Sequence, residues 1–227
     1  MLFKLADNTS QNSLASRLRR NRIRKFVGLL SGTKDQVRVL DVGGTPEFWL
    51  RHRDELPPNV ALTLLNLDFA NKPSYPWIHY VSGDVRRMSM FSRGEFDICF
   101  SNSVIEHLGT FADQELAAQE IRRVARGYFV QTPNIWFPLE PHFLVPFWQF
   151  VPVTFRAYLL QQRDFGWMKR QRDPLTARGA VETVRLLSAS ELLRLFPDGQ
   201  IDREKLGPFT KSIIARRQVN AGGERAR

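Results

Sequence analysis

Residues that can bind a ligand or move a proton follow four apolar segments in the first half of this 227-residue chain. Carboxylates accept hydrogen bonds from hydroxyl and ammonium groups, glycines leave backbone amides accessible, and histidine exchanges protons near neutral pH. Together these residue types predict a binding site with a proton-transfer group beside it. In chain order they are Asp41, Gly43 and Gly44 at the first segment, Asp68 after the second, Asp84 after the third, and Asn102, Glu106 and His107 after the fourth.

The segments that carry these residues alternate between the patterns of strands and helices. Apolar runs favour buried strands, and amphipathic runs favour helices. The alternation predicts an α/β fold with a Rossmann-like, mostly parallel sheet, helices on both faces and an antiparallel last strand. Ligands of such sheets bind beyond the carboxyl ends of the strands, where the polar residues would meet. We expect strands at 37–42, 61–67, 77–81, 96–101, 128–131 and 210–216, and helices at 13–30, 112–124 and 188–196. A further helix can start at Pro46, with Thr45 as its N-cap.

The turn after the first strand departs from the glycine-rich fingerprint of dinucleotide-binding proteins. That fingerprint, G-x-G-x-x-G, lets a pyrophosphate rest on a helix N-terminus. Here Thr45 and Phe48 stand where the second and third glycines belong, and Glu47 would place a negative charge beside the phosphates. These three residues argue against NAD or FAD and favour a ligand without a phosphate.

S-adenosylmethionine is a phosphate-free ligand whose groups match the polar residues at the strand ends. Gly43 and Gly44 supply the tight turn that lets backbone approach the ligand. Asp41 can act on its ammonium end, Asp68 can accept from the ribose hydroxyls, and Asp84 can accept from the adenine amino group. Each acid also has a simpler interpretation, because aspartates often solvate strand ends and open turns.

The chain resembles the class I methyltransferases of type 11 in VLDVGG (39–44), NLD (66–68), GDV (83–85), FDICFSNSVIEHLG (96–109) and EIRRVARGYFVQTPN (120–134). The resemblance covers residues 37–134, and SNSVIEH followed by QTPN is its most specific part. It implies a methyltransferase that uses S-adenosylmethionine. One departure is that Pro46 and Glu47 stand where the family often has a third glycine, which would alter the cofactor pose or mark an inactive protein. On this basis the cofactor-binding residues are Asp41, Gly43, Gly44, Asp68, Asp84, Val85 and Asn102.

Four side chains at and beyond the fourth strand are candidates for proton transfer. A hydroxyl or carbon acceptor of the methyl group would need a general base, whereas a carboxylate or free amine would not. His107 is the first candidate because it follows the fourth strand, where the methyl group should lie; the others are Glu106, His142 and Glu140. Glu106 and His107 have the alternative role of bonding only loop backbone or contacting the cofactor. We expect no metal site, and the single cysteine, Cys99, cannot form a cysteine-rich zinc site.

An aromatic, proline-rich segment follows the fifth strand. Residues 135–182 lie where this fold often carries an acceptor lid, and an aromatic pocket favours a flat, apolar or lipid-like acceptor. The alternatives are packing against the N-terminal helix, a dimer contact, or a face toward a membrane helped by basic residues. The sequence leaves the oligomeric state open. The aromatic residues are Trp136, Phe137, Phe143, Phe147, Trp148, Phe150 and Phe155.

Positive charge is concentrated at the two ends of the chain. Of the net charge of +10, residues 1–30 carry +6 and residues 216–227 carry +3, so the part between them is nearly neutral. A neutral domain argues against a nucleic-acid groove, and nucleic acid is not the expected partner. Residues 13–30 predict a helix that either packs on the domain with a solvated basic face or binds a membrane or nucleic acid.

The chain is expected to comprise a basic N-terminal helical extension (1–30), a methyltransferase domain (31–216) with the lid at 135–182, and a basic tail (217–227). No signal peptide or membrane span is evident, which favours a cytoplasmic protein, with peripheral membrane contact as a further option. The leading expectation is methyl transfer to a small-molecule, glycan-linked or lipid-like acceptor. The alternatives are a nucleic-acid or protein methyltransferase that docks through its basic termini, and a non-catalytic binding module on the same fold.

Overall fold

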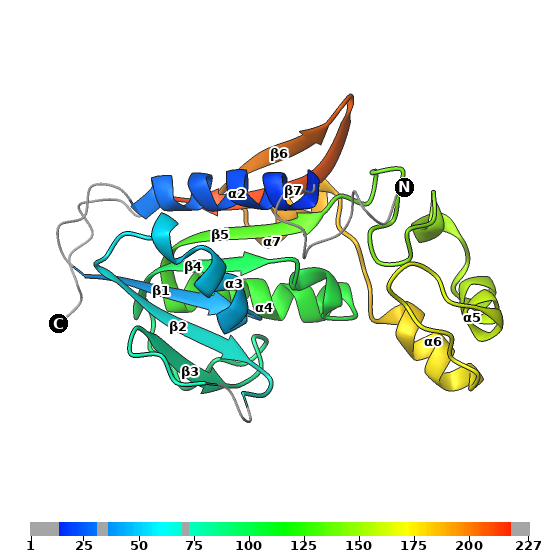
Figure 1. The fold of residues 1–227 in the computed structure, drawn as a ribbon, viewed down its shortest axis with the longest axis horizontal. Coiled ribbons are helices and arrows are strands. Elements are labelled where there is room, and N and C mark those ends of the chain that lie inside the picture. The colour runs from blue at the N-terminus through cyan, green and yellow to red at the C-terminus, as the bar shows by residue number, and fades with distance from the viewer. Residues whose placement is uncertain (1–13, 31–35, 70–72, 219–227) are drawn as a thin grey trace.

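A seven-stranded sheet runs through the middle of the molecule, and the computed structural model describes residues 14–30, 36–69 and 73–218 around it. The strand order is β3-β2-β1-β4-β5-β7-β6 (Figure 1), with β1 to β5 parallel and β7 antiparallel to both of its neighbours. The predicted mostly parallel sheet and antiparallel last strand are confirmed. The strands are β1 (Val37–Val42), β2 (Val60–Asn66), β3 (Ile78–Ser82), β4 (Phe96–Asn102), β5 (Ala125–Pro133), β6 (Gln200–Leu206) and β7 (Phe209–Arg217).

The strand order reverses between β1 and β4, which are neighbours in the sheet although two strands separate them in sequence. Ligands of open α/β sheets bind at this switch, beyond the carboxyl ends of the two strands. Val39, Ile98 and Phe129 show why these central strands are apolar, because each is fully buried between layers. The residues that follow β1 and β4 are therefore placed side by side.

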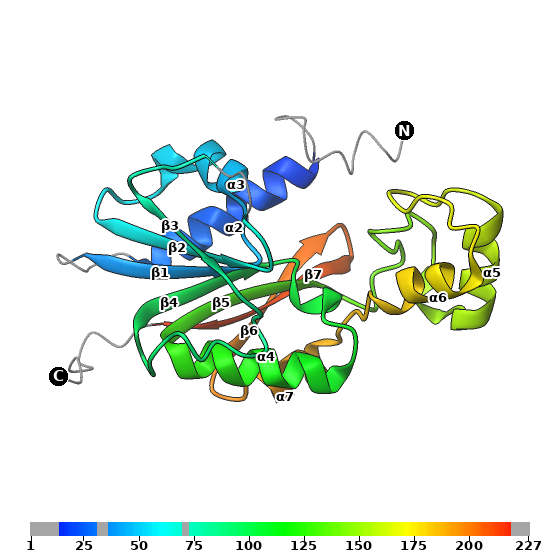
Figure 2. The same cartoon turned by 90° about the horizontal axis from the view of Figure 1, so that it is seen from below.

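Helix α2 (Leu14–Leu30) and the short helix α3 (Pro46–Arg51) cover one face of the sheet (Figure 2). Ile23 and Phe26 of α2 are fully buried, and the Phe26 ring lies 4.7 Å from that of Phe100 on β4. The predicted helix thus packs on the domain and keeps a solvated basic face, formed by Arg17, Arg20, Arg24 and Lys25. The rest of the predicted basic extension, residues 1–13, lies outside the described residues, as do 219–227 of the basic tail.

Helices α4 (Phe111–Val124) and α7 (Ala189–Leu195) cover the opposite face. Both begin with a capping box, in which Thr110 or Ser188 caps the helix and an acid three residues later bonds back to the cap. Ala117 and Ile121 of α4 are buried against the sheet. Helices on both faces are confirmed, although no helix forms between β2 and β3 or between β3 and β4 in the described residues.

The segment between β5 and α7 forms a separate lobe at the carboxyl edge of the sheet (Figures 1 and 2). It contains the 3-10 turn η3 (Trp148–Phe150) and helices α5 (Val153–Gln162) and α6 (Pro174–Glu182). The lobe has its own small core, and both of its ends meet at the sheet, where Asn134 and Leu187 form a parallel bridge. We call residues 135–186 the lid. The buried core residues are Phe143, Trp148, Leu160, Phe165 and Val181.

Three elements were not predicted. Strand β6 is a polar edge strand in which only Glu204 is buried, so it lacks the apolar pattern of the inner strands. Helix α5 exposes Phe155 and Tyr158 and lacks the one-sided apolar stripe that marks a helix in sequence. Helix α6 is short and begins directly after Asp173 at a proline. Within the described residues, no helix is both long enough and apolar enough to cross a membrane.

Candidate active site

The turn after β1 has a conformation that only glycine accepts. Gly43 has φ +76°, and a Cβ atom there would lie 2.5 Å from Cγ2 of Val104. A Cβ atom on Gly44 would lie 1.9 Å from Oδ2 of Asp41, far inside contact distance. The turn is held by the Gly43 amide, which donates to the carbonyl of Leu65 at 2.7 Å. A side chain at either position would clash with these neighbours, so the turn requires glycine, and its role in cofactor binding stays a prediction.

Asp41 is a buried carboxylate at the end of β1. It is 2% exposed, and its Oδ2 accepts a hydrogen bond from Nε1 of Trp49 at 2.6 Å. Burial raises the pKa of Asp41 to about 8, and the bond from Trp49 offsets this only in part. A cationic ligand group beside Asp41 would stabilise its charged form. The side chain therefore fits the predicted role of facing an ammonium group.

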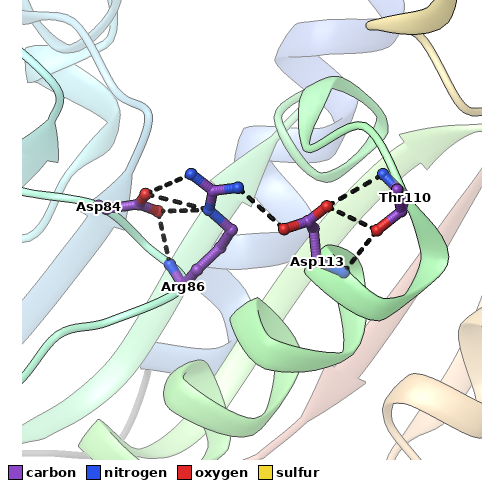
Figure 3. A network of polar contacts seen from close by, with 4 residues as sticks. All are labelled: Asp84, Arg86, Thr110 and Asp113. Atoms are coloured by element: carbon purple, nitrogen blue, oxygen red, sulfur yellow. Dashed lines mark hydrogen bonds and ion pairs between the residues drawn. The ribbon is translucent and has the colours of Figure 1, made fainter.

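The acids after β2 and β3 differ in their surroundings. Asp68 is exposed two residues beyond β2. Asp84 accepts hydrogen bonds from Arg86 on both carboxylate oxygens, at 2.6 to 3.1 Å, and Arg86 also donates to Asp113 of α4 at 2.8 Å (Figure 3). The hydrogen bonds from Arg86 lower the pKa of Asp84 and keep it charged. An adenine amino group would share this carboxylate with Arg86. Val85, also assigned to the cofactor, packs in the core below α4.

Asn102 is held by an arginine that sequence analysis did not single out. Nη1 of Arg22 donates to the side-chain oxygens of Asn102 and Gln131, and Nη2 forms a 2.7 Å ion pair with Glu204. Arg22 is only 6% exposed. The spacing of the helix indicates that Arg22 is buried, because it lies one turn before the buried Phe26 and so falls on the apolar stripe of α2.

The three predicted catalytic side chains come together. Glu106, His107 and His142 each place a ligand-type atom within 4.8 Å of the others, although the first two follow β4 and His142 belongs to the lid. The rings of His107 and His142 meet edge to face, with their centroids 4.8 Å apart. The structure thus brings these three side chains together, and their catalytic role stays a prediction.

Glu106 is fully buried, yet only one of its carboxylate oxygens has a protein partner. Oε2 accepts from the hydroxyl of Thr132 on β5 at 3.0 Å, whereas Oε1 is buried without a hydrogen bond. Burial raises the pKa of Glu106 to about 7. A buried carboxylate oxygen without a partner costs free energy unless a ligand satisfies it.

Glu140 orients His142. One oxygen of the buried Glu140 accepts from Nδ1 of His142 at 2.6 Å, and the other accepts from the amides of His142 and Phe143. Burial lowers the pKa of His142, but the bond to Glu140 and the charges of Glu140 and Glu106 outweigh it, so the pKa is raised. Burial and the neighbouring His142 lower the pKa of His107, which keeps that ring neutral at pH 7. Glu140, a candidate base in the sequence, thus acts as a hydrogen-bond acceptor for its own loop.

The loop that carries Glu106 and His107 is fixed by a buried glutamine that no pattern in the sequence marks as functional. Nε2 of Gln114, on α4, donates to the carbonyls of Ile105 and Arg185. The amide of Arg185 in turn donates to the carbonyl of Glu106 at 2.8 Å. Helix α4 and Arg185, at the end of the lid, therefore both hold the 3-10 turn η2 (Ile105–His107).

Known proteins resemble this chain in part of its sequence and in its fold. Residues 59–130 match the methyltransferase domain family. A methyltransferase from an antibiotic biosynthesis pathway of Anabaena variabilis is similar in structure, with TM-score 0.52 and 12% identity over 82% of this chain and 64% of that protein. The YcgJ protein of Bacillus subtilis gives TM-score 0.51 and 18% identity over 82% and 71%, and an O-methyltransferase family protein of Burkholderia thailandensis gives 0.51 and 9% over 92% and 59%.

No curated protein matches the sequence. The chain spans less than two thirds of the Anabaena and Burkholderia proteins, and at these identities the likeness is one of fold. The domain match includes β2 to β4 and reaches into β5, the part of the sheet that carries Asp68, Asp84, Glu106 and His107. Residues 59–130 thus match the methyltransferase domain family, and the sheet around them has the Rossmann-like fold of solved methyltransferases.

Proposed function

We propose that the protein transfers a methyl group from S-adenosylmethionine to a small molecule held between the end of β4 and the lid. The observation that carries this proposal is the meeting of Glu106, His107 and His142 beside the switch point of the sheet. Such a cluster lies where the methyl group of a cofactor bound at the end of β1 would be presented. When bound, the cofactor supplies a methyl group that its sulfonium has already activated.

The residues after β1 fit the methionine end of the cofactor. The bare backbone of Gly43 and Gly44 allows close approach, and the buried Asp41 would face the ammonium group. Asp68 and Asp84 would bind the ribose hydroxyls and the adenine amino group. Of these, Asp84 stays charged because Arg86 holds it, so its oxygens can accept a further hydrogen bond.

The residues after β4 and in the lid fit an acceptor with a polar reacting atom. Neutral His107 can accept a proton from a hydroxyl, and Glu106 has a free carboxylate oxygen beside it. Holding the acceptor in line with the methyl group and keeping water out would contribute most of the rate. The aromatic side chains of the lid favour an acceptor with a flat or lipid-like part.

Calorimetry with S-adenosylmethionine and S-adenosylhomocysteine tests this function. We expect both to bind the wild-type protein and to bind Gly44→Val weakly or not at all. Gly179→Ala is the matched control, because nothing lies within 4 Å of a Cβ atom at that helical glycine. Failure of the wild type to bind either compound would favour a non-catalytic module on the methyltransferase fold.

A membrane-bound acceptor is supported by the outer surface of the lid. Six large aromatic side chains of the lid are exposed, and five of its basic side chains are exposed as well. Aromatic and cationic groups together bind anionic lipid surfaces. We expect co-sedimentation with vesicles that contain phosphatidylserine and less with neutral vesicles; no binding at low salt would exclude the membrane. The aromatic residues are Trp136, Phe147, Phe150, Phe155, Tyr158 and Trp167, and the basic ones are Arg163, Lys169, Arg170, Arg172 and Arg178.

A further inference from the structure

We propose that Glu106, His107 and His142 bind one divalent transition-metal ion of the zinc class, between the end of β4 and the lid. The ion would lie in the acceptor site. With the ion bound, His107 would be a ligand, and the ion would replace its ring in activating the acceptor hydroxyl. The inference therefore deepens the proposed function and rests on it for its role in methyl transfer. Metal binding itself does not depend on that function and can be measured alone. This proposal reverses the expectation of no metal site that was drawn from the sequence, in which the ligands lie 35 residues apart and have no motif spacing.

The ligand set suits zinc. Two imidazoles and one carboxylate supply the donors of many catalytic zinc sites, in which a fourth position stays open for water or substrate. The three ligand atoms lie within 4.8 Å of one another. Around zinc, with bonds of about 2.1 Å, tetrahedral ligands are separated by about 3.4 Å. Closure from the largest separation of 4.8 Å needs a shift of about 1.4 Å.

The unpartnered oxygen of Glu106 is the independent sign of a ligand. Glu106 is 0% exposed, and Oε1 is buried with no hydrogen bond although Oε2 is bonded to Thr132. Buried charged groups persist when they are paired or bind a metal. A cation against Oε1 would satisfy this atom and hold the carboxylate in its charged form.

The surrounding hydrogen bonds are those of a metal site. Glu140 accepts from Nδ1 of His142, which fixes the tautomer that leaves Nε2 with a free lone pair for a cation. Thr132 steadies Glu106 in the same way. Metal-binding histidines usually have such a carboxylate behind them. Imidazole ligands favour zinc and its transition-metal neighbours over magnesium, which prefers oxygen ligands.

Zinc titration of the tag-free, chelator-treated protein, followed by calorimetry, tests the site. We expect one Zn²⁺ per chain, with affinity at least about 100-fold lower in His107→Ala and in His142→Ala and about 10–100-fold lower in Glu140→Gln. His79→Ala is the matched control, because His79 is exposed on β3 away from the cluster and should bind zinc like the wild type. Thermal melting shows whether each variant is folded.

Co²⁺ absorption gives a second readout. A four-coordinate site of nitrogen and oxygen ligands should give visible bands in the wild type and in His79→Ala but not in His107→Ala. Saturable zinc binding that survives in both cluster histidine variants, or no saturable binding by the folded wild type, would overturn the proposal.

The same chelator-treated protein is also titrated with S-adenosylmethionine. If the protein binds zinc but not the cofactor, the metal site stands and the proposed function fails. If it binds the cofactor but no zinc, the metal site is refuted and the function stands.

Discussion

The end of β1 and the end of β4 lie side by side in the sheet but are built in different ways. At β1 the site is made of backbone, since Gly43 and Gly44 leave no room for a side chain. At β4 it is made of side chains, since Glu106, His107 and His142 gather from two distant segments. The first arrangement suits a ligand that never varies, and the second suits a ligand that can change when a few residues change. Variants on each side should therefore fail in different ways.

The largest effect is expected on the β4 side. His107→Ala should lower turnover by about 10²–10⁴-fold, because proton transfer or acceptor positioning is lost. The dissociation constant of S-adenosylmethionine should stay within about twofold, a free-energy change well below 1 kcal/mol. Turnover assays and calorimetry on the same preparation check this, with His79→Ala as control. Equal losses in turnover and cofactor affinity would show that the β4 side also binds the cofactor and would contradict the division of roles between the two strand ends.

The next effect is expected on the β1 side. In Gly44→Ala the new Cβ atom would meet Oδ2 of Asp41 at 1.9 Å, so the turn or the carboxylate must move. We expect a destabilisation of roughly 1–3 kcal/mol and a more than tenfold loss of cofactor affinity. Thermal melting and calorimetry give both values. Gly179→Ala should keep full affinity, and a Gly44→Ala variant that did the same would show that bare backbone is not needed.

A smaller effect, which depends on pH, is expected at Asp41. Its pKa is raised to about 8 in the folded protein, above the unfolded value near 4, so the folded state holds an extra proton between these values. Asp41 therefore favours folding less as pH rises from about 4 to about 8, by at most about 1.4 kcal/mol per pH unit. The Asp41→Asn side chain does not titrate. The free energy of unfolding of this variant should therefore fall less than that of the wild type as pH rises from about 4 to about 8.

Chemical denaturation of wild type and Asp41→Asn at pH 5, 6, 7 and 8 measures this difference. S-adenosylmethionine should also bind Asp41→Asn more weakly, because the charge facing its ammonium group is gone. Parallel stability curves for the two proteins would mean that Asp41 is charged throughout this range.

The smallest effect is expected at Asp84. Its pair with Arg86 is about one third exposed, so Arg86→Ala should change stability by only about 0–1 kcal/mol. If Asp84 accepts from adenine, Asp84→Asn should weaken cofactor binding up to about tenfold, whereas Arg86→Ala should leave it nearly unchanged. Calorimetry on both variants separates these cases. Equal losses would assign the effect to the network in Figure 3 and not to a contact with the cofactor.

The β1 side could be predicted from sequence because its signals are local. A strand of six residues, a pair of glycines and a helix starting at Pro46 follow one another, and the structure has them at the expected places. Thr45 occupies the predicted N-cap position but makes no side-chain cap bond. The alternation of apolar runs also gave the sheet type, since parallel strands are buried on both faces.

The β4 side could be predicted only in part. The candidate residues were named, but their meeting depends on the lid, whose helix α5 lacks an amphipathic sequence pattern. The support of Gln114 and Arg22 was missed because a polar side chain within an amphipathic helix usually faces solvent. Both are buried here, and each bonds residues more than 70 positions away or in other elements. Hydrogen bonds between residues so far apart cannot be identified from a single sequence.

The bridge between Asn134 and Leu187 makes the lid an insertion whose two ends lie next to each other. The amide of Ile135 donates to the carbonyl of Leu187 at 3.0 Å, so the excursion leaves and rejoins the sheet at one point. A segment with adjoining ends can be lengthened, shortened or exchanged at little cost in chain entropy and without shifting a strand. Because His142 belongs to the lid, exchanging the lid would change the cluster of Glu106, His107 and His142 together with the surroundings of the acceptor. One exchange of the lid would thereby change both the acceptor that is bound and the side chains that act on it.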